Sequence, residues 1–245
     1  MESAGNVLQR TARGSLAYVQ SPGQSPGVMF CCGYGSDMSG TKALALEDYC
    51  RRNNRSFVRF DYTRCGKSDG DFNKSTLGEW KEDALDVLDQ VAQGPQVIVG
   101  SSMGGWLMLF LAMERQERVK ALVGVAAAPD FTRWRVYSEQ VLEDLKTKGV
   151  AYYETPYGTM SISRKFLEES ESHWLLNKAV LNITCPVRLL HGMKDDSVPY
   201  DISLQVADKV VSENVEVLLR KSGDHRLSTP EDILLLTQTL DKLLT

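Results

Sequence analysis

The chain has 245 residues, 42% of them hydrophobic and 24% charged, which is enough to build one sizeable core without splitting into two domains. Its 28 basic and 32 acidic residues give a net charge of -4 with no basic run, so we expect neither nucleic acid nor an anionic membrane surface as a main partner. No apolar stretch reaches about 18 residues, so the sequence predicts no transmembrane helix.

Short apolar runs alternate with helical patterns along the chain, as a mostly parallel sheet covered by helices requires. The pattern predicts strands at residues 16–19, 28–31, 56–60, 97–99, 121–125, 187–190 and 215–219. It predicts helices at residues 41–52, 77–92, 103–115, 203–211 and 231–244. The expected fold class is therefore α/β, and we expect the first strand to pair antiparallel at an edge of the sheet.

The alternation breaks between about residues 129 and 181. Helical patterns at 134–148 and 163–176 flank a tyrosine-rich stretch with a turn at 151–158. We expect a small lid here, inserted into a single domain of residues 1–245. Several apolar side chains of the segment either line an acyl pocket or attach the lid to the core: Trp134, Tyr137, Met160, Phe166 and Trp174.

The stretch from residue 95 to residue 106 carries the strongest signal for chemistry. An apolar strand leads into Gly100, Ser102 and Gly104 in the spacing Gly-x-Ser-x-Gly, and an apolar helix follows. This pattern is typical of a nucleophile elbow, in which a side chain two residues from the serine would collide with the neighbouring strand and helix. The adjacent Ser101 does not fit, because Val99 and Met103 occupy its glycine positions. The pattern therefore predicts Ser102 as the nucleophile.

Two later strand ends carry candidates for an acid and a base. Asp195 follows the strand at 187–190, and His225 follows the strand at 215–219. The order Ser, Asp, His along the chain is that of the α/β-hydrolases and differs from those of the chymotrypsin-like and subtilisin-like enzymes. Of the three histidines, His173 and His191 precede the acid, and we expect both to serve in packing. The prediction is an α/β-hydrolase fold with helices on both faces of the sheet and His225 as the base.

Three aspartates compete for the role of the acid. Asp195 is favoured because it has the spacing His-Gly-x-x-Asp-x-x-Val-Pro that is common in this loop. Asp196 is its neighbour, and Asp130 follows an earlier strand where some hydrolases of this fold keep their acid.

Acyl transfer also needs N–H groups directed at the oxyanion. We expect the backbone N–H of Met103, at a helix N-terminus, and that of Tyr34, in the loop after the strand at 28–31. Cys32 stands before the glycine of this loop, where histidine or proline is more usual.

Other patterns point away from bound groups. Asp61 stands where a phosphate loop ending at Gly66 would need a glycine, and Met38 occupies the third glycine position of a dinucleotide fingerprint. The five cysteines have neither a disulfide framework nor metal-ligand spacing, and we expect reduced thiols. The sequence therefore predicts no cofactor and no metal, and it specifies no oligomeric state. We expect the loop at 61–69, with Arg64 in place of a usual glycine, to be structural.

Five segments carry a family resemblance: residues 41–47, 75–80, 100–108, 187–196 and 219–226. They resemble the mitochondrial palmitoyl-protein thioesterases among the abhydrolase-domain proteins, over nearly the whole chain after about residue 15. The resemblance implies a serine hydrolase that removes fatty acyl groups from S-acylated proteins and also hydrolyses acyl-glucuronide esters. It places Ser102, Asp195 and His225 on the family's nucleophile, acid and base.

Alternatives remain open at this point. A small-molecule carboxylesterase or lactonase would have the same triad, and a hydrolase fold can also serve as a non-catalytic scaffold. The resemblance implies a mitochondrial location. The alternative is a cytosolic one, because residues 1–13 have no convincing presequence.

Overall fold

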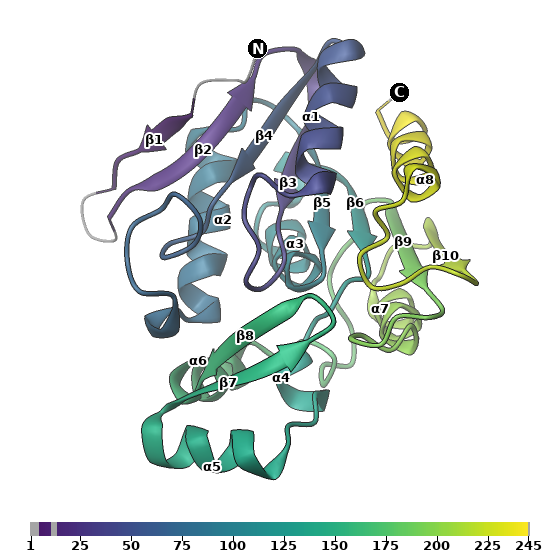
Figure 1. The fold of residues 1–245 in the computed structure, drawn as a ribbon. Helices are drawn as coiled ribbons and strands as arrows, with labels where there is room; N and C mark the ends of the chain where they lie inside the picture. The colour runs from purple at the N-terminus through teal and green to yellow at the C-terminus, as the bar shows by residue number, and fades with distance from the viewer. Residues whose placement is uncertain (1–4, 11–13, 245) are drawn as a thin grey trace.

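The computed structural model describes residues 5–10 and 14–244 of the chain (Figure 1). The presequence expectation rests on residues 1–13, of which 1–4 and 11–13 lie outside the described residues. One mixed sheet of eight strands runs through the molecule. In spatial order its strands are β1 (Asn6–Leu8), β2 (Leu16–Ser21), β4 (Arg55–Phe60), β3 (Gln24–Cys31), β5 (Gln96–Ser101), β6 (Val119–Val125), β9 (Val187–Gly192) and β10 (Val215–Arg220).

The expected position of the first predicted strand was wrong in one respect. β2 pairs antiparallel with β4, as predicted, but it does not lie at the edge of the sheet. β1 pairs antiparallel outside it, with Asn6 opposite Tyr18. A strand of three residues is too short to show an alternating pattern, so the sequence carried no signal for it.

The other strand pairs of the sheet are parallel, and helices connect most of them. On one face of the sheet, α1 (Thr41–Arg52) packs beside α8 (Pro230–Asp241). On the other face, α2 (Leu77–Gln90) packs beside α3 (Met103–Glu114). α7 (Asp201–Lys209) lies near β9 and β10 (Figure 1). Each lies within a few residues of its predicted range. Short 3₁₀ turns occur at η1 (Phe72–Lys74), η2 (Gln116–Arg118) and η3 (Glu171–His173). No helix of the described residues is long and apolar enough to cross a bilayer.

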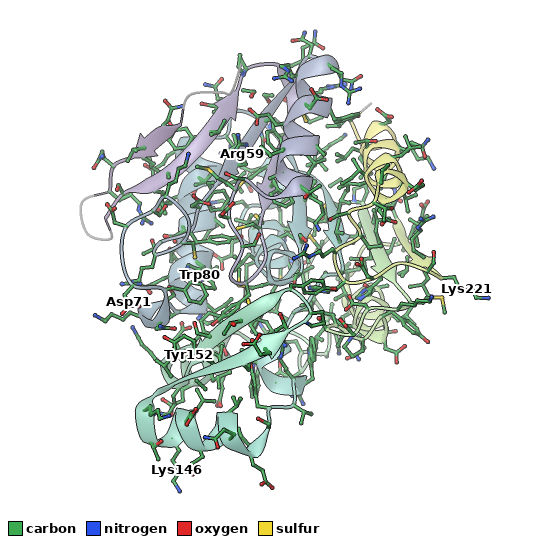
Figure 2. All side chains as sticks on the ribbon, in the orientation of Figure 1. Arg59, Asp71, Trp80, Lys146, Tyr152 and Lys221 are labelled. Atoms are coloured by element: carbon green, nitrogen blue, oxygen red, sulfur yellow. The ribbon has the colours of Figure 1, made fainter. Side chains whose placement is uncertain are left out.

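The segment between β6 and β9 departs from the predicted pair of helices. It contains α4 (Phe131–Trp134), α5 (Glu139–Lys148), a hairpin of β7 (Val150–Thr155) and β8 (Gly158–Ser163), and α6 (Arg164–Ser170). The hairpin was missed because its outer face is partly exposed and its sequence reads as turn-rich. This insertion lies against one end of the sheet (Figure 1), and Trp80 on α2, labelled in Figure 2, packs against Phe166 of α6.

The loop after β4 has the structural role that its sequence suggested. The Asp61 carboxylate accepts hydrogen bonds from the N–H groups of Met38, at 2.7 Å, and Lys67, at 2.8 Å. Arg64 has a φ of 66°, in the left-handed region that glycine adopts most easily. Its guanidinium pairs with Glu79 at 2.6 Å, so the arginine at this position is fixed by an ion pair to α2.

Gly104 is a point where α3 nearly touches β3. A Cβ at this position would lie 2.0 Å from the carbonyl oxygen of Cys31, and backbone atoms cannot move aside as a side chain can. Gly104→Ala should therefore lower the free energy of unfolding by about 3 kcal/mol and the melting midpoint by about 6 to 12 °C. Gly5→Ala is the control, because a Cβ there meets nothing within 4 Å, and thermal unfolding of both variants is the measurement. Equal midpoints would contradict the close approach.

Candidate active site

Ser102 sits at the turn between β5 and α3 in a strained backbone conformation. Its φ is 54° and its ψ is -120°, a combination that L-residues rarely adopt. Three backbone hydrogen bonds hold the turn: the N–H of Ser102 donates to Val125, and the N–H groups of Gly105 and Ala128 donate to the Ser102 carbonyl. A strand on one side and a buried helix on the other therefore fix the position of the Ser102 hydroxyl.

His225 lies beside this hydroxyl and joins it to Asp195. Its Nε2 is 3.1 Å from the Ser102 Oγ, and its Nδ1 is 2.8 Å from Asp195 Oδ2. The loops that follow β9 and β10 bring the two side chains together, because these neighbouring parallel strands end at the same edge of the sheet. The structure thus brings together the three residues that the sequence proposed as nucleophile, base and acid.

The Asp195 carboxylate has four hydrogen-bond donors. Oδ1 accepts from the N–H groups of Ser197, at 2.9 Å, and Val198, at 2.8 Å, while Oδ2 accepts from His225 and from Nε2 of His191 at 3.2 Å. Burial alone would raise the pKa of Asp195, but the hydrogen bonds from His191, His225 and the backbone outweigh it and hold this pKa far below its usual value. The side chain is fully buried and stays ionised at neutral pH.

His191 contacts the acid, which sequence reasoning did not anticipate. It is buried and hydrogen-bonded, as expected of a packing histidine, but one of its partners is Asp195. Its Nε2 also lies 3.1 Å from the carbonyl oxygen of Val198, which can only accept, so Nε2 carries the proton. Nδ1 lies 2.7 Å from the Ser203 hydroxyl, so both ring nitrogens have a hydrogen-bond partner. The His191 ring thus orients the carboxylate, and the His191–Asp195 spacing of four residues after a strand end was the available signal.

The other candidates have different partners. Asp130 is buried and accepts from the N–H groups of Leu175 and Leu176, at 2.8 and 2.7 Å, which ties the start of the insertion to its end. Asp196 is exposed and accepts from the hydroxyl of the adjacent serine. His173 pairs with Glu169 at 2.8 Å within the insertion. None of these three side chains is bonded to His225 among the described residues.

The two expected oxyanion donors flank Ser102. Met103 is the first residue of α3, where backbone N–H groups have no partner within the helix. The loop of Tyr34 passes close by, since a Cβ on Gly33 would lie 3.2 Å from Cβ of Ser102. The Tyr34 hydroxyl donates to the carbonyl of Ser161 at 2.9 Å, so its side chain is occupied in the insertion. Cys32 is buried, which raises the pKa of its thiol and keeps it neutral.

A pocket of about 390 Å³ opens at Ser102 and His225. Aromatic and apolar side chains of the insertion form part of its wall: Phe131, Trp134, Tyr153, Tyr157 and Met160. Polar and cationic side chains form another part: Ser36, Thr41, Lys42, Arg226 and Ser228. All five cysteines are free thiols, and the described residues contain no cluster of histidine, cysteine and carboxylate groups suited to a metal ion.

The mostly parallel sheet, the strained serine between strand and helix, and the bonded series of serine, histidine and aspartate define the α/β-hydrolase class. A family model described as "Prolyl oligopeptidase family" matches residues 82–243. A mouse protein named palmitoyl-protein thioesterase ABHD10, mitochondrial, is 46% identical over 98% of this chain and 82% of its own length. The chain therefore belongs to the ABHD10 family, and the prolyl oligopeptidase family model also covers most of it.

Solved structures agree with this assignment. The alpha/beta hydrolase domain-containing protein 10 from mouse superposes with a TM-score of 0.90 at 44% identity and covers 98% of both chains. A putative hydrolase from Agrobacterium vitis S4 superposes with a TM-score of 0.92 at 31% identity, over 100% of this chain and 99% of its own.

Proposed function

We propose that this hydrolase removes fatty acyl groups from S-acylated cysteines of proteins, with Ser102 as nucleophile, His225 as base and Asp195 as orienting acid. The observation that carries the proposal is the uninterrupted series of hydrogen bonds from Ser102 Oγ through His225 to Asp195, at 3.1 and 2.8 Å, beside a pocket whose wall is partly apolar. The name of the mouse relative supports the thioester as the bond that is cleaved.

The reaction follows from the positions of these groups. The Ser102 hydroxyl attacks the thioester carbonyl carbon while His225 Nε2 takes its proton. The N–H groups of Met103 and Tyr34 hold the oxyanion of the tetrahedral intermediate. His225 then gives the proton to the sulfur as the C–S bond breaks, which leaves an acyl ester on Ser102. A water molecule, deprotonated by His225, attacks this ester and releases the fatty acid.

The insertion at about residues 129–181 serves as a lid in this proposal. It forms a wall of the pocket through Trp134, Tyr153 and Met160, and the bond from the Tyr34 hydroxyl to Ser161 ties it to the oxyanion loop. The aromatic rings of Phe131 and Phe166 pack edge-on around the Tyr34 ring. The same contacts attach the lid to the core.

Esters form a second substrate class, because serine attacks an ester carbonyl by the same steps. The polar part of the pocket wall favours alcohols and sugars as leaving groups, which includes the acyl glucuronides that the family resemblance implies. A general carboxylesterase or lactonase is the competing assignment. We further propose a mitochondrial location, as the names of the mouse and human relatives state for those proteins.

Hydrolysis of a palmitoyl-cysteine peptide, compared with that of a short-chain ester of a simple alcohol, tests the proposal. Labelling by a fluorophosphonate probe first establishes an activated serine. A higher kcat/KM for the peptide supports the thioesterase. A strong preference for the short ester would assign a carboxylesterase, and a folded protein that takes up no probe would contradict the hydrolase mechanism.

A further inference from the structure

Two cationic side chains lie on the His225 side of the pocket. Lys42, on α1, donates from Nζ to the carbonyl of Arg226 at 2.5 Å and to the Ser228 hydroxyl at 3.3 Å. Arg226 follows His225 directly, and its guanidinium carbon lies 4.4 Å from the ring centre of Tyr157, which is itself 6.2 Å from the His225 ring. The ammonium and the guanidinium are therefore both anchored beside the base.

Neither cation forms an ion pair with a carboxylate in the described part of the chain. No Asp or Glu oxygen lies within 4.0 Å of the charged groups of Lys42 or Arg226 there. Burial lowers the pKa of Lys42 to about 8, an effect that Asp224 and Asp232 partly oppose and Arg226 reinforces. Asp37 also lines the pocket, and the hydrogen bond that its carboxylate accepts from the N–H of Ser39 leaves its negative charge in place. An anion that entered here would gain two opposite charges without displacing an existing ion pair.

The position beside His225 decides which part of a substrate meets these cations. The proposed function requires His225 to give a proton to the departing sulfur or oxygen, so the leaving group must lie on the His225 side. The rings of Trp134 and Tyr153 in the insertion form another part of the pocket wall for the acyl chain, with the Arg135 guanidinium over the Tyr153 ring.

We propose that Lys42 and Arg226 form a subsite for a carboxylate carried by the leaving group, so that this hydrolase prefers acylated cysteines with an acidic residue beside them. The inference rests on the proposed function for the identity of the leaving group. The shared chemistry is a carboxylate near the scissile bond, and a sugar acid offers it as well as a peptide does.

The test uses substrates that differ only in charge. The peptides acetyl-Gly-Cys-Glu-amide and acetyl-Gly-Cys-Gln-amide, each S-octanoylated, are compared with each other, and octanoyl glucuronate is compared with octanoyl glucose. We expect kcat/KM to be about tenfold higher for the anionic member of the peptide pair, and this ratio to fall towards one in Lys42→Met/Arg226→Gln and at high salt. Arg133→Gln is the matched control, since Arg133 also stacks on an aromatic ring, Trp174, but lies outside the pocket, and it should keep the ratio.

Binding separates this inference from the proposed function. The dissociation constants of the same peptides for Ser102→Ala, measured by calorimetry, report the subsite without turnover, and we expect about tenfold tighter binding of the Glu peptide. If the wild type did not turn over either peptide, the thioesterase assignment would be contradicted. The comparison of dissociation constants would still test the subsite. Equal affinities for both peptides, or a charge preference that survives the double substitution, would overturn the subsite. If only the sugar pair showed a preference for the anionic member, the proposal that the subsite binds an acidic peptide residue would be overturned.

Discussion

Ser102→Ala is expected to lower kcat by about a million-fold, which corresponds to about 8 kcal/mol of lost transition-state stabilisation, by analogy with dissected serine triads. Without the hydroxyl, His225 has no nucleophile to activate, and only the oxyanion donors and substrate binding still favour the reaction. Alanine keeps the Cβ, so the turn at φ 54° should survive. Thioester hydrolysis and fluorophosphonate labelling of purified protein are the measurements.

The control for this prediction is the preceding residue. Ser101 is buried at the end of β5, and the glycine spacing excludes it as the nucleophile. Ser101→Ala should therefore retain most of the activity and take up the probe. The assignment would fail if Ser102→Ala kept more than a few per cent of wild-type turnover, or if Ser101→Ala alone abolished labelling.

Asp195→Asn is the second change with a large effect, and we expect kcat to fall by about ten-thousand-fold. The carboxylate accepts from His225 Nδ1, which keeps Nε2 free to take the proton of Ser102. An asparagine amide group at the same place can donate to Nδ1 and so favour the wrong tautomer. Steady-state kinetics of Asp196→Asn provide the matched control, since that exposed side chain has no bond to His225 and its loss should change kcat less than twofold. Equal losses in both variants would remove Asp195 from the triad.

The same substitution should also change how stability depends on pH. The folded state holds the pKa of Asp195 below its unfolded value of about 3.9, so the carboxylate stabilises the fold above that pH. This contribution is lost as the pH falls below about 4, where the unfolded chain takes up a proton that the native site resists. As the pH is lowered from about 7 to about 3, the melting midpoint should therefore fall less steeply for Asp195→Asn than for the wild type. Thermal unfolding of both proteins across this range is the measurement.

Part of the site is encoded in short stretches of sequence. Gly100, Ser102 and Gly104 form a local pattern, because the collisions that exclude side chains there occur within one strand–turn–helix unit and its nearest strand. The helices that cover the sheet were also predicted within a few residues, since a helical pattern depends on neighbours three and four positions apart. The order of Ser102, Asp195 and His225 along the chain follows from the same local strand ends.

What the tertiary structure decided concerns partners far apart in the sequence. Asp195 and Asp130 each follow a strand, and Asp196 is the neighbour of Asp195. The packing of β9 against β10 brings Asp195, and neither of the other two, to His225. His191 was predicted only as a packing residue, and its bond to Asp195 was not anticipated, because its partners Ser203 of α7 and the Val198 carbonyl are set by the tertiary fold.

The same limit explains the remaining differences. β1 and the β7–β8 hairpin were missed because a three-residue edge strand and a half-exposed hairpin have little hydrophobic period of their own, so tertiary contacts stabilise them. Lys42 donates a hydrogen bond to the Arg226 carbonyl, although more than 180 residues separate the two in sequence. A local sequence pattern cannot predict a contact between such distant residues. The sequence by itself determined the nucleophile motif and the order of elements, because both depend on near neighbours. Only the tertiary structure placed Asp195, which the sequence had favoured, beside His225 and showed which second histidine and which cations lie near Ser102, because those contacts depend on how distant segments pack.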